Sequence, residues 1–369
     1  MKYFDKKNVL IISPESWGLS FLSKHHYALL LAESGNHVWF LNSFHNPTAE
    51  LPEQFVKKTQ GRLKLLKDES PRGIRFMPTF IQKMAFKNWI RKIEKSEKVK
   101  FDVVWSFDNT RLFHLDCFDC FRIHHVVDIY MNFHLAEACR SADLCLGVTG
   151  EIVEMMKVFN SNAHLIRHGF RLPEPVLTDV VLSSDRPKAA YLGNFFMKTF
   201  DAELLLKIAR DFPQCDFILI GATGVSHLTR DPDPERLSTL DKMKALPNVK
   251  FVGERSYDEA FSIVNQCDIM LMMHFNLTRP YDNASKLMSY VATGKVTVSN
   301  PVVEYASTDL LCIAKDRQEF PVVFGSVLAN LSFWNSSEKA EQRRKYADKY
   351  QYKNVIGEIE NLILQTERK

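Results

Sequence analysis

Short apolar runs typical of buried strands alternate in this chain with longer helical patterns. The first set is a strand pattern at Val9–Ser13, a helical pattern at Leu22–Ser34 that Gly35 ends, and a second strand pattern at His37–Leu41. A strand, a helix and a strand in this order form a βαβ unit, whose strands are parallel and whose crossover is right-handed. The chain is therefore constrained to an α/β fold built on parallel sheets.

The alternation continues through both halves of the chain. Further strand patterns occur at residues 101–106, 123–127, 144–148, 164–167, 188–192, 216–220, 249–252 and 268–273. Between the halves, residues 171–187 hold three prolines and several small polar residues, which is typical of a linker. We expect two Rossmann-like, doubly wound parallel-sheet domains at residues 1–172 and 188–349, joined by a linker at 173–187. A helix at 350–369 is expected to return to the first domain.

Composition limits the class of protein. With 369 residues, 46% of them hydrophobic and 25% charged, the chain has the composition of a soluble globular protein and is long enough for two cores. Its seven cysteines include one isolated CxxC pair and no framework spacing, so we expect reduced thiols, a cytoplasmic location and no metal site. The chain has no GxGxxG, GxxxxGK[ST] or GxSxG motif, which weighs against dehydrogenases, P-loop nucleotidases and serine hydrolases.

Positive charge is concentrated in the first half of the chain. Residues 1–175 hold 24 Lys and Arg against 19 Asp and Glu, whereas the remainder holds 24 against 25. Residues 80–100 set apolar side chains such as Met84, Phe86 and Trp89 among lysines and arginines, which is the pattern of a basic amphipathic helix. Such a helix could lie on an anionic membrane surface, or it could cover the sheet of the first domain.

A short helix followed by a buried strand is expected at Asn283–Asn300. Asn283 and Ser285 are candidate caps, Lys286 lies in the first turn, and Gly294 ends the helix. The N-terminus of a helix presents backbone N–H groups and a partial positive charge, and a lysine there adds a full charge. The segment is therefore suited to bind a phosphate, although an ordinary αβ unit would show the same pattern.

Other strand ends carry further candidate residues. In the second half, the first strand closes with Gly193 and Asn194, and Lys198 follows before the next helix, which together could cradle a diphosphate. In the first half, Gly18 lies in the loop after the first strand and Asp128 follows a later one. Because the carboxyl ends of parallel strands meet at one edge of a sheet, these residues are placed where ligands bind, or they belong to ordinary βα loops.

Several longer segments resemble a known family. Residues 191–221 are similar to its series of strand, glycine, basic residue, helix, strand and glycine. Residues 246–272 and 284–299 resemble its Asn-Val strand with the following helix and strand, and its helix–Gly-Lys–strand segment. Residues 124–133 and 142–156 are similar to stretches of its first domain. The family is the nucleotide-sugar glycosyltransferases of the GT-B architecture, and the chain looks most like the retaining bacterial polysaccharide and teichuronic-acid-type branch.

The resemblance implies a role for each candidate, and it also departs from the family at two positions. The glutamate that binds the nucleotide ribose falls on Ser289 and an earlier carboxylate falls on Tyr281, so Asp282 or Glu304 would have to substitute. The catalytic candidates are Asp128 on the acceptor side, and Lys198 and Lys286 at the donor diphosphate. The donor-contacting candidates are Gly18, Gly193, Asn194, Asn283, Ser285, Ser289 and Glu304.

The function implied by the resemblance is a glycosyl transfer between two domains facing a cleft. A retaining, hexosyltransferase-type enzyme would move a sugar from a UDP- or GDP-sugar to a glycan or lipid-linked acceptor in cell-surface polysaccharide biosynthesis. No metal or other cofactor and no nucleic acid is expected, since lysines can neutralise the leaving diphosphate. Two alternatives stay open: a non-catalytic GT-B protein that binds nucleotide sugars or glycans, and a GT-B sugar-nucleotide epimerase, which would need carboxylates for proton transfer.

Overall fold

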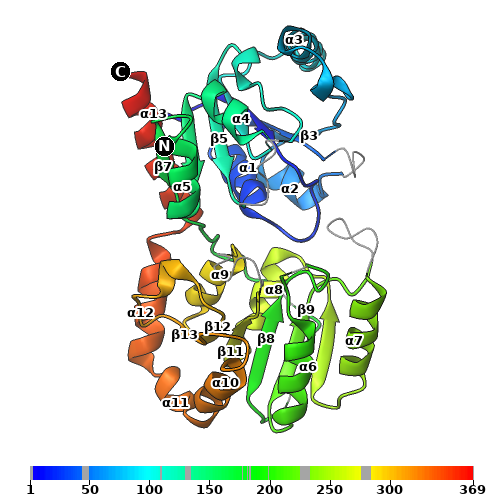
Figure 1. Ribbon diagram of the computed structural model, residues 1–369, viewed down its shortest axis with the longest axis vertical. Helices are drawn as coiled ribbons and strands as arrows, with labels where there is room; N and C mark the ends of the chain where they lie inside the picture. The colour runs from blue at the N-terminus through cyan, green and yellow to red at the C-terminus, as the bar shows by residue number, and fades with distance from the viewer. Residues whose placement is uncertain are drawn as a thin grey trace. The chain divides into compact units, whose positions relative to one another are not determined.

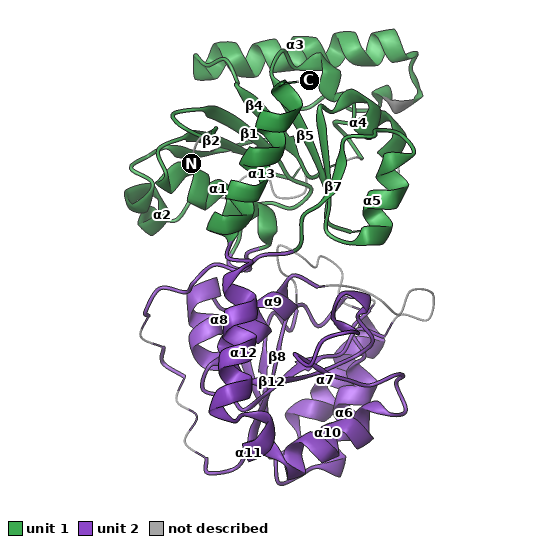
Figure 2. Cartoon of the chain, turned by 90° about the vertical axis from the view of Figure 1, so that its left-hand side faces the viewer, with its two compact units in different colours: residues 1–18, 22–167, 352–369 green, residues 19–21, 168–351 purple. Residues whose placement is uncertain are grey.

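The structure is a computed structural model that describes residues 3–43, 50–108, 110–128, 134–176, 178–180, 182, 184–197, 199–224, 233–275 and 284–368, with only the backbone at Arg75. The chain forms two compact units, coloured separately in Figure 2. Unit 1 comprises residues 1–18, 22–167 and 352–369, and unit 2 comprises residues 19–21 and 168–351. The division therefore falls after Arg167 rather than after residue 172, and the segment 173–187 belongs to unit 2.

Unit 1 is built on a seven-stranded sheet in the order β3-β2-β1-β4-β5-β6-β7, with every neighbouring pair parallel. Its strands are β1 (Asn8–Ile12), β2 (His37–Leu41), β3 (Leu63–Leu66), β4 (Val103–Ser106), β5 (Phe121–Val126), β6 (Leu144–Gly147) and β7 (Ala163–Leu165). The strand order reverses between β1 and β4. This is the topology of a doubly wound fold, as the alternation of patterns predicts.

Helices cover both faces of this sheet (Figure 1). They are α1 (Ser23–Glu33), α2 (Glu53–Lys58), α3 (Thr79–Glu97), α4 (Leu135–Ser141), α5 (Gly150–Lys157) and α13 (Tyr352–Glu367), with short 3-10 turns η1 (Ile74–Phe76) and η2 (Leu115–Cys117). Tyr27 of α1 packs against Trp105 of β4 and Tyr352 of α13, with ring centroids 4.6 and 4.9 Å apart. The C-terminal helix is thus part of the core of unit 1.

The basic amphipathic helix predicted at residues 80–100 is confirmed as α3. Its buried face consists of Gln82, Phe86, Trp89 and Ile90, and the apolar members pack into one hydrophobic cluster with residues of β1, β2 and β4. The interpretation that this helix covers the sheet of the first domain is therefore correct for its inner face.

Unit 2 contains a six-stranded parallel sheet in the order β10-β9-β8-β11-β12-β13. Its strands are β8 (Lys188–Leu192), β9 (Asp216–Ile220), β10 (Val249–Gly253), β11 (Ile269–Met272), β12 (Val296–Ser299) and β13 (Cys312–Ile313). Its helices are α6 (Ala202–Asp211), α7 (Pro234–Lys244), α8 (Tyr257–Val264), α9 (Lys286–Thr293), α10 (Phe320–Ala329), α11 (Leu331–Trp334) and α12 (Ser337–Asp348), with a 3-10 turn η3 (Val303–Tyr305). Strand order reverses between β8 and β11, so ligands are expected at the carboxyl ends of these strands.

A buried arginine fixes the end of α9 in unit 2. Arg343 of α12 is 1% exposed, and its guanidinium donates to the carbonyl oxygens of Leu310, Gly294 and Trp334 at 3.2, 3.1 and 2.8 Å. The C-terminal carbonyls of a helix have no partner within the helix, so a donor of this kind holds the helix end in place. Gly294 ends α9 in the left-handed conformation, as predicted.

Within the described ranges, no helix combines the length and the apolar character that crossing a membrane requires.

Candidate functional site

Three neighbouring strands of unit 2 end in glycine. Gly193 follows β8, Gly221 follows β9 and Gly253 closes β10, and their φ angles are 152°, 151° and 84°. The N–H of Gly193 donates to the carbonyl of Ile220, and the N–H of Gly221 donates to the carbonyl of Gly253, both at 3.0 Å. Backbone without side chains therefore lines the carboxyl edge of the sheet across three strands.

The structure leaves no room for a side chain at Gly221, whereas Gly193 lies against the flexible end of Lys286. A Cβ added to Gly221 would overlap the carbonyl oxygen of Gly193 and lie 3.0 Å from its carbonyl carbon. A Cβ added to Gly193 would lie 2.8 Å from Nζ of Lys286. Gly193 and Lys286, predicted separately from two motifs, are therefore adjacent in the structure. Glycine is needed here both for its backbone conformation and for this close approach.

Lys286 is the first residue of α9 and stands over the end of β8. Its Nζ lies 4.0 Å from the ring centroid of Tyr191, and it makes no ion pair with a carboxylate of the described residues. The residue as a whole is half-buried, but the ammonium lies against the ring. Burial lowers the pKa of Lys286 to about 7, so the free protein holds this charge only weakly at neutral pH. An anion bound beside the ammonium would raise that pKa again.

A buried histidine completes this cluster, and no motif in the sequence pointed to it. The Nε2 of His274, two residues after β11, lies 3.4 Å from the hydroxyl of Tyr191, and its Nδ1 has no hydrogen-bond partner among the described residues. Burial, and then the charge of Lys286, lower the pKa of His274 well below its usual value. His274 is therefore neutral, and it can accept or donate one hydrogen bond at this edge of the sheet.

The N-terminus of α9 differs from the expectation. Ser285 precedes the helix in a helical conformation (φ −54°, ψ −32°) and makes no side-chain capping bond, so its role as a cap is wrong. A capping serine needs an extended backbone to turn its hydroxyl toward the N–H groups of the first turn. In the first turn, the N–H of Leu287 donates to the carbonyl of Ala284 at 2.9 Å. The partial positive charge of a helix N-terminus still favours an anion next to Lys286. Asn283, the other candidate cap, lies outside the described residues.

Ser289, one turn along α9, is directed toward α8. It is 8% exposed. Burial raises the pKa of the Tyr257 hydroxyl to about 12, and a hydrogen bond with Ser289 partly offsets that rise. The Tyr257 hydroxyl also donates to the carbonyl of Arg171 at 2.7 Å, while both carboxylate oxygens of Asp258 accept from Arg171 at 2.7 Å. Ser289 is thus tied into a local network rather than into the Lys286 cluster.

The remaining candidates make no described contact with Lys286, or they lie outside the described residues. Asn194 directly follows Gly193, and its side-chain oxygen accepts from the N–H of Phe196 at 2.9 Å, which shapes the turn after β8. Glu304 is half-buried on η3 in unit 2. Asp128, exposed after β5, and Gly18, half-buried in the loop after β1, belong to unit 1. Lys198 and Tyr281 lie outside the described residues.

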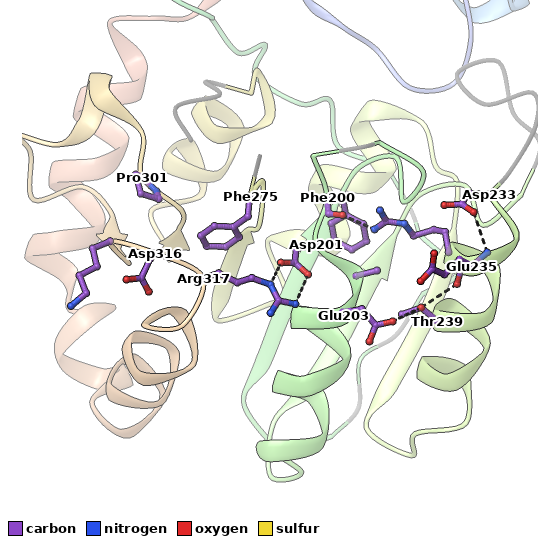
Figure 3. A pocket seen from close by; sticks show the side chains of 13 residues that line it. Phe200, Asp201, Glu203, Asp233, Glu235, Thr239, Phe275, Pro301, Asp316 and Arg317 are labelled. Atoms are coloured by element: carbon purple, nitrogen blue, oxygen red, sulfur yellow. Dashed lines mark hydrogen bonds and ion pairs between the residues drawn. The ribbon is translucent and has the colours of Figure 1, made fainter. Parts of the chain in front are cut away.

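A cavity of about 590 Å³ opens beside this edge of unit 2 (Figure 3). Its walls come from the starts of α6 and α7 and from the loops after β11, β12 and β13. Figure 3 shows Arg317 turned toward Asp201, with which it forms an ion pair, and Thr239 donating to Glu203 at 2.6 Å. The ring of Phe200, which lines the cavity, lies 4.4 Å from that of Tyr191. The cavity is therefore next to the Lys286 cluster. Its lining carries five carboxylates against three cations, and the acidic members are Asp201, Glu203, Asp233, Glu235 and Asp316.

No protein-family model and no characterised protein matches the chain by sequence. Solved structures do match it over almost their whole length. Anabaena HepE (Alr3699) in complex with UDP and glucose has a TM-score of 0.69 at 11% identity, over 97% of this chain and 100% of that one. Sucrose-phosphate synthase from Thermosynechococcus elongatus has a TM-score of 0.66 at 14% identity, over 97% and 98%.

A third match is the lipopolysaccharide outer core galactosyltransferase WaaB, in its apo form. It has a TM-score of 0.60 at 12% identity, over 97% of this chain and 99% of that one. The chain therefore has the two-domain α/β fold of these GT-B proteins, with parallel sheets of seven and six strands.

Proposed function

We propose that the protein is a glycosyltransferase that takes its sugar from a nucleoside diphosphate sugar. The observation that carries the proposal is the position of Lys286. It lies at the N-terminus of α9, where Ser285 makes no side-chain capping bond, and beside the strand ends at Gly193 and Gly221. This arrangement suits an anion with several oxygens, such as a diphosphate. The structural neighbours support it, since HepE was solved with UDP and with UDP-glucose.

The chemistry follows from the charge that develops at the diphosphate. When the bond between the anomeric carbon and the β-phosphate oxygen breaks, negative charge builds up on the leaving nucleoside diphosphate. The ammonium of Lys286 and the first-turn N–H groups of α9 would stabilise that charge without a metal ion, with Lys198 as a second cation. A lysine whose pKa is near 7 gains its proton as the anion binds, so binding of the diphosphate places the positive charge beside it.

The finer points of the proposal concern the two substrates. We propose a UDP- or GDP-hexose as donor, with Ser289 offering at most a neutral contact near the ribose. The acceptor would be a glycan or a lipid-linked sugar of cell-surface polysaccharide, bound by unit 1 with Asp128 beside its hydroxyl. Transfer with retention at the anomeric carbon is part of the same proposal.

Calorimetry tests this function directly. The protein is titrated with UDP, GDP and ADP and with their hexose conjugates, and each tight binder is then incubated with glycan and lipid-linked acceptors. We expect one nucleotide to bind, and the Lys286→Met variant to bind it about 10- to 100-fold more weakly, the usual contribution of a hydrogen bond to a charged group. Lys295→Met, at the other end of α9, serves as the matched control. Absence of binding by every nucleotide would refute the donor site, and tight binding without transfer or hydrolysis would favour the non-catalytic alternative.

A further inference from the structure

The outward face of α3 carries side chains that its packing against the sheet does not use. Gln82, Phe86, Trp89 and Ile90 point inward. On the opposite side, exposed residues recur at spacings of three and four, which places them in one row along the helix. This row, here called the α3 face, consists of Phe80, Met84, Lys87, Arg91, Lys95 and the C-cap Lys98.

One end of the α3 face is apolar and largely exposed to solvent. Phe80 and Met84 are 70% and 57% exposed, and Phe76 and Met77, from and just after η1, are 81% and 49% exposed. Single exposed apolar side chains are common on soluble proteins, but four large ones within nine residues form a patch. A patch of this kind marks a surface that another apolar phase covers.

The rest of the α3 face is cationic. Its cations are Lys87, Arg91, Lys95 and Lys98. The surrounding segment 72–100 contains nine Lys and Arg against two Glu, a net charge of 9 − 2 = +7, although Lys83 pairs with Asp116. Glu94 pairs with Lys100, and Glu97 pairs with Lys64 at 3.2 Å and accepts from the indole N–H of Trp39 at 2.9 Å. Both carboxylates are half-buried and engaged, so neither opposes the positive charge along the row.

We propose that the α3 face is a docking surface for an anionic phospholipid bilayer. Phe76, Phe80 and Met84 enter the interface between headgroups and acyl chains, while the cations behind them lie at the level of the lipid phosphates. The 19-residue helix is about 28 Å long, so it reaches many headgroups when it lies along the surface. A nucleic acid would match the charge but would leave the aliphatic and aromatic patch in water, which favours the bilayer.

Flotation with lipid vesicles tests the electrostatic half of this proposal. The protein is expected to float with phosphatidylcholine vesicles that contain about 30% phosphatidylglycerol, and far less with pure phosphatidylcholine. The triple variant Lys87→Glu, Arg91→Glu and Lys95→Glu should lose at least about 100-fold in partition, since each cation near an anionic surface contributes about fivefold. The control Lys242→Glu and Lys345→Glu reverses exposed charges of unit 2 and should change partition little.

The apolar half is tested separately. The pair Phe80→Ser and Met84→Ser leaves the charge unchanged and should lower partition about 10-fold or more, because both side chains lose their burial in lipid. In a Phe80→Trp variant, the added indole should be quenched by brominated lipids only in anionic vesicles. The proposal would be overturned if the unit 2 control lost as much partition as the triple variant, or if the serine pair lost none. It would also be overturned if the fluorescence of the added indole stayed unquenched on bound vesicles. UDP titration of every variant shows that the fold and the donor site are retained.

Discussion

Replacing Lys286 by methionine separates what this lysine does for binding from what it costs the fold. Methionine keeps a similar length and flexibility, so the ring of Tyr191 stays covered while the ammonium is removed. A lysine that serves only the fold would destabilise the protein when lost. Loss of a lysine held ready for an anion should instead stabilise the protein, because folding buries the ammonium without a negative partner among the described residues.

The magnitude follows from the pKa of Lys286. Burial lowers it from 10.5 to about 7, so between these pH values the unfolded chain binds a proton that the folded chain does not. The stability of the wild type is therefore reduced in full below pH 7, and it recovers as the pH rises toward 10.5. At about 1.4 kcal/mol for each pKa unit the whole difference is about 5 kcal/mol. Because the side chain is only half-buried, solvent screening reduces this to roughly 1–3 kcal/mol.

Hydrogen exchange of the amides in β8 and β11 measures this effect within unit 2. At about pH 6, Lys286→Met should raise the free energy of opening by about 1–3 kcal/mol, and the gain should shrink toward zero by about pH 10. Lys295→Met should show neither the gain nor its pH dependence. A Lys286→Met variant that is less stable than the wild type at pH 6, with a difference independent of pH, would refute the reasoning.

Three further predictions concern the same unit and its control, and a fourth concerns ligand binding. Gly221→Ala should destabilise unit 2 by at least about 2 kcal/mol, since the new methyl overlaps the carbonyl of Gly193. Gly357→Ala in α13, where a Cβ meets nothing within 4 Å, should stabilise unit 1 by about 0.5–1 kcal/mol, and equal thermal shifts in the two variants would contradict this account. Arg343→Met should cost about 2–4 kcal/mol in urea denaturation, because three carbonyls lose their donor, and an unchanged midpoint would speak against it. Binding of UDP at about pH 8 should take up a proton at Lys286, which calorimetry in buffers of different ionisation enthalpy detects; zero uptake would exclude that proton transfer.

Much of the framework could be predicted from the sequence. The strands at His37–Leu41, Lys188–Leu192 and Asp216–Ile220 begin and end where the patterns place them. Strands in the middle of a parallel sheet are buried on both faces, so they appear as short continuous apolar runs. In unit 2, Gly193 and Gly221 also mark where two of them end. α6 adds a capping Asp201 whose side chain accepts from the N–H of Leu204 at 2.9 Å.

Elements at the edges of the sheets could not be predicted in the same way. β3 (Leu63–Leu66) is an edge strand within a charged stretch, with Leu63 buried and Lys64 exposed, so it lacks the apolar run of a central strand. α10 (Phe320–Ala329) is rich in valine and phenylalanine, whose local preference favours a strand. Its helix is stabilised by Phe320 and Phe324, which are fully buried in the core of unit 2.

The candidate site shows the same division between local and long-range information. Gly193 and Lys286 could be proposed because strand ends and helix starts gather at one edge of a parallel sheet, even 93 positions apart in the sequence. The contact of His274 with Tyr191 depends on the pairing of β11 with β8. The direction of Ser289 toward Tyr257 depends on how α9 packs against α8. That Gly193, Gly221 and Gly253 lie side by side became visible only from the backbone hydrogen bonds that join their strand ends.

The central claim is that the positive end of α9, with Lys286 over the glycine-lined strand ends, binds a diphosphate. A crystal structure of the protein with UDP tests it most directly. We expect the phosphates beside the N–H groups of the first turn of α9, with an oxygen within about 3 Å of the Lys286 ammonium, as in charge-assisted hydrogen bonds. Density for UDP elsewhere on the protein, with the Lys286 ammonium still over the Tyr191 ring, would contradict the account.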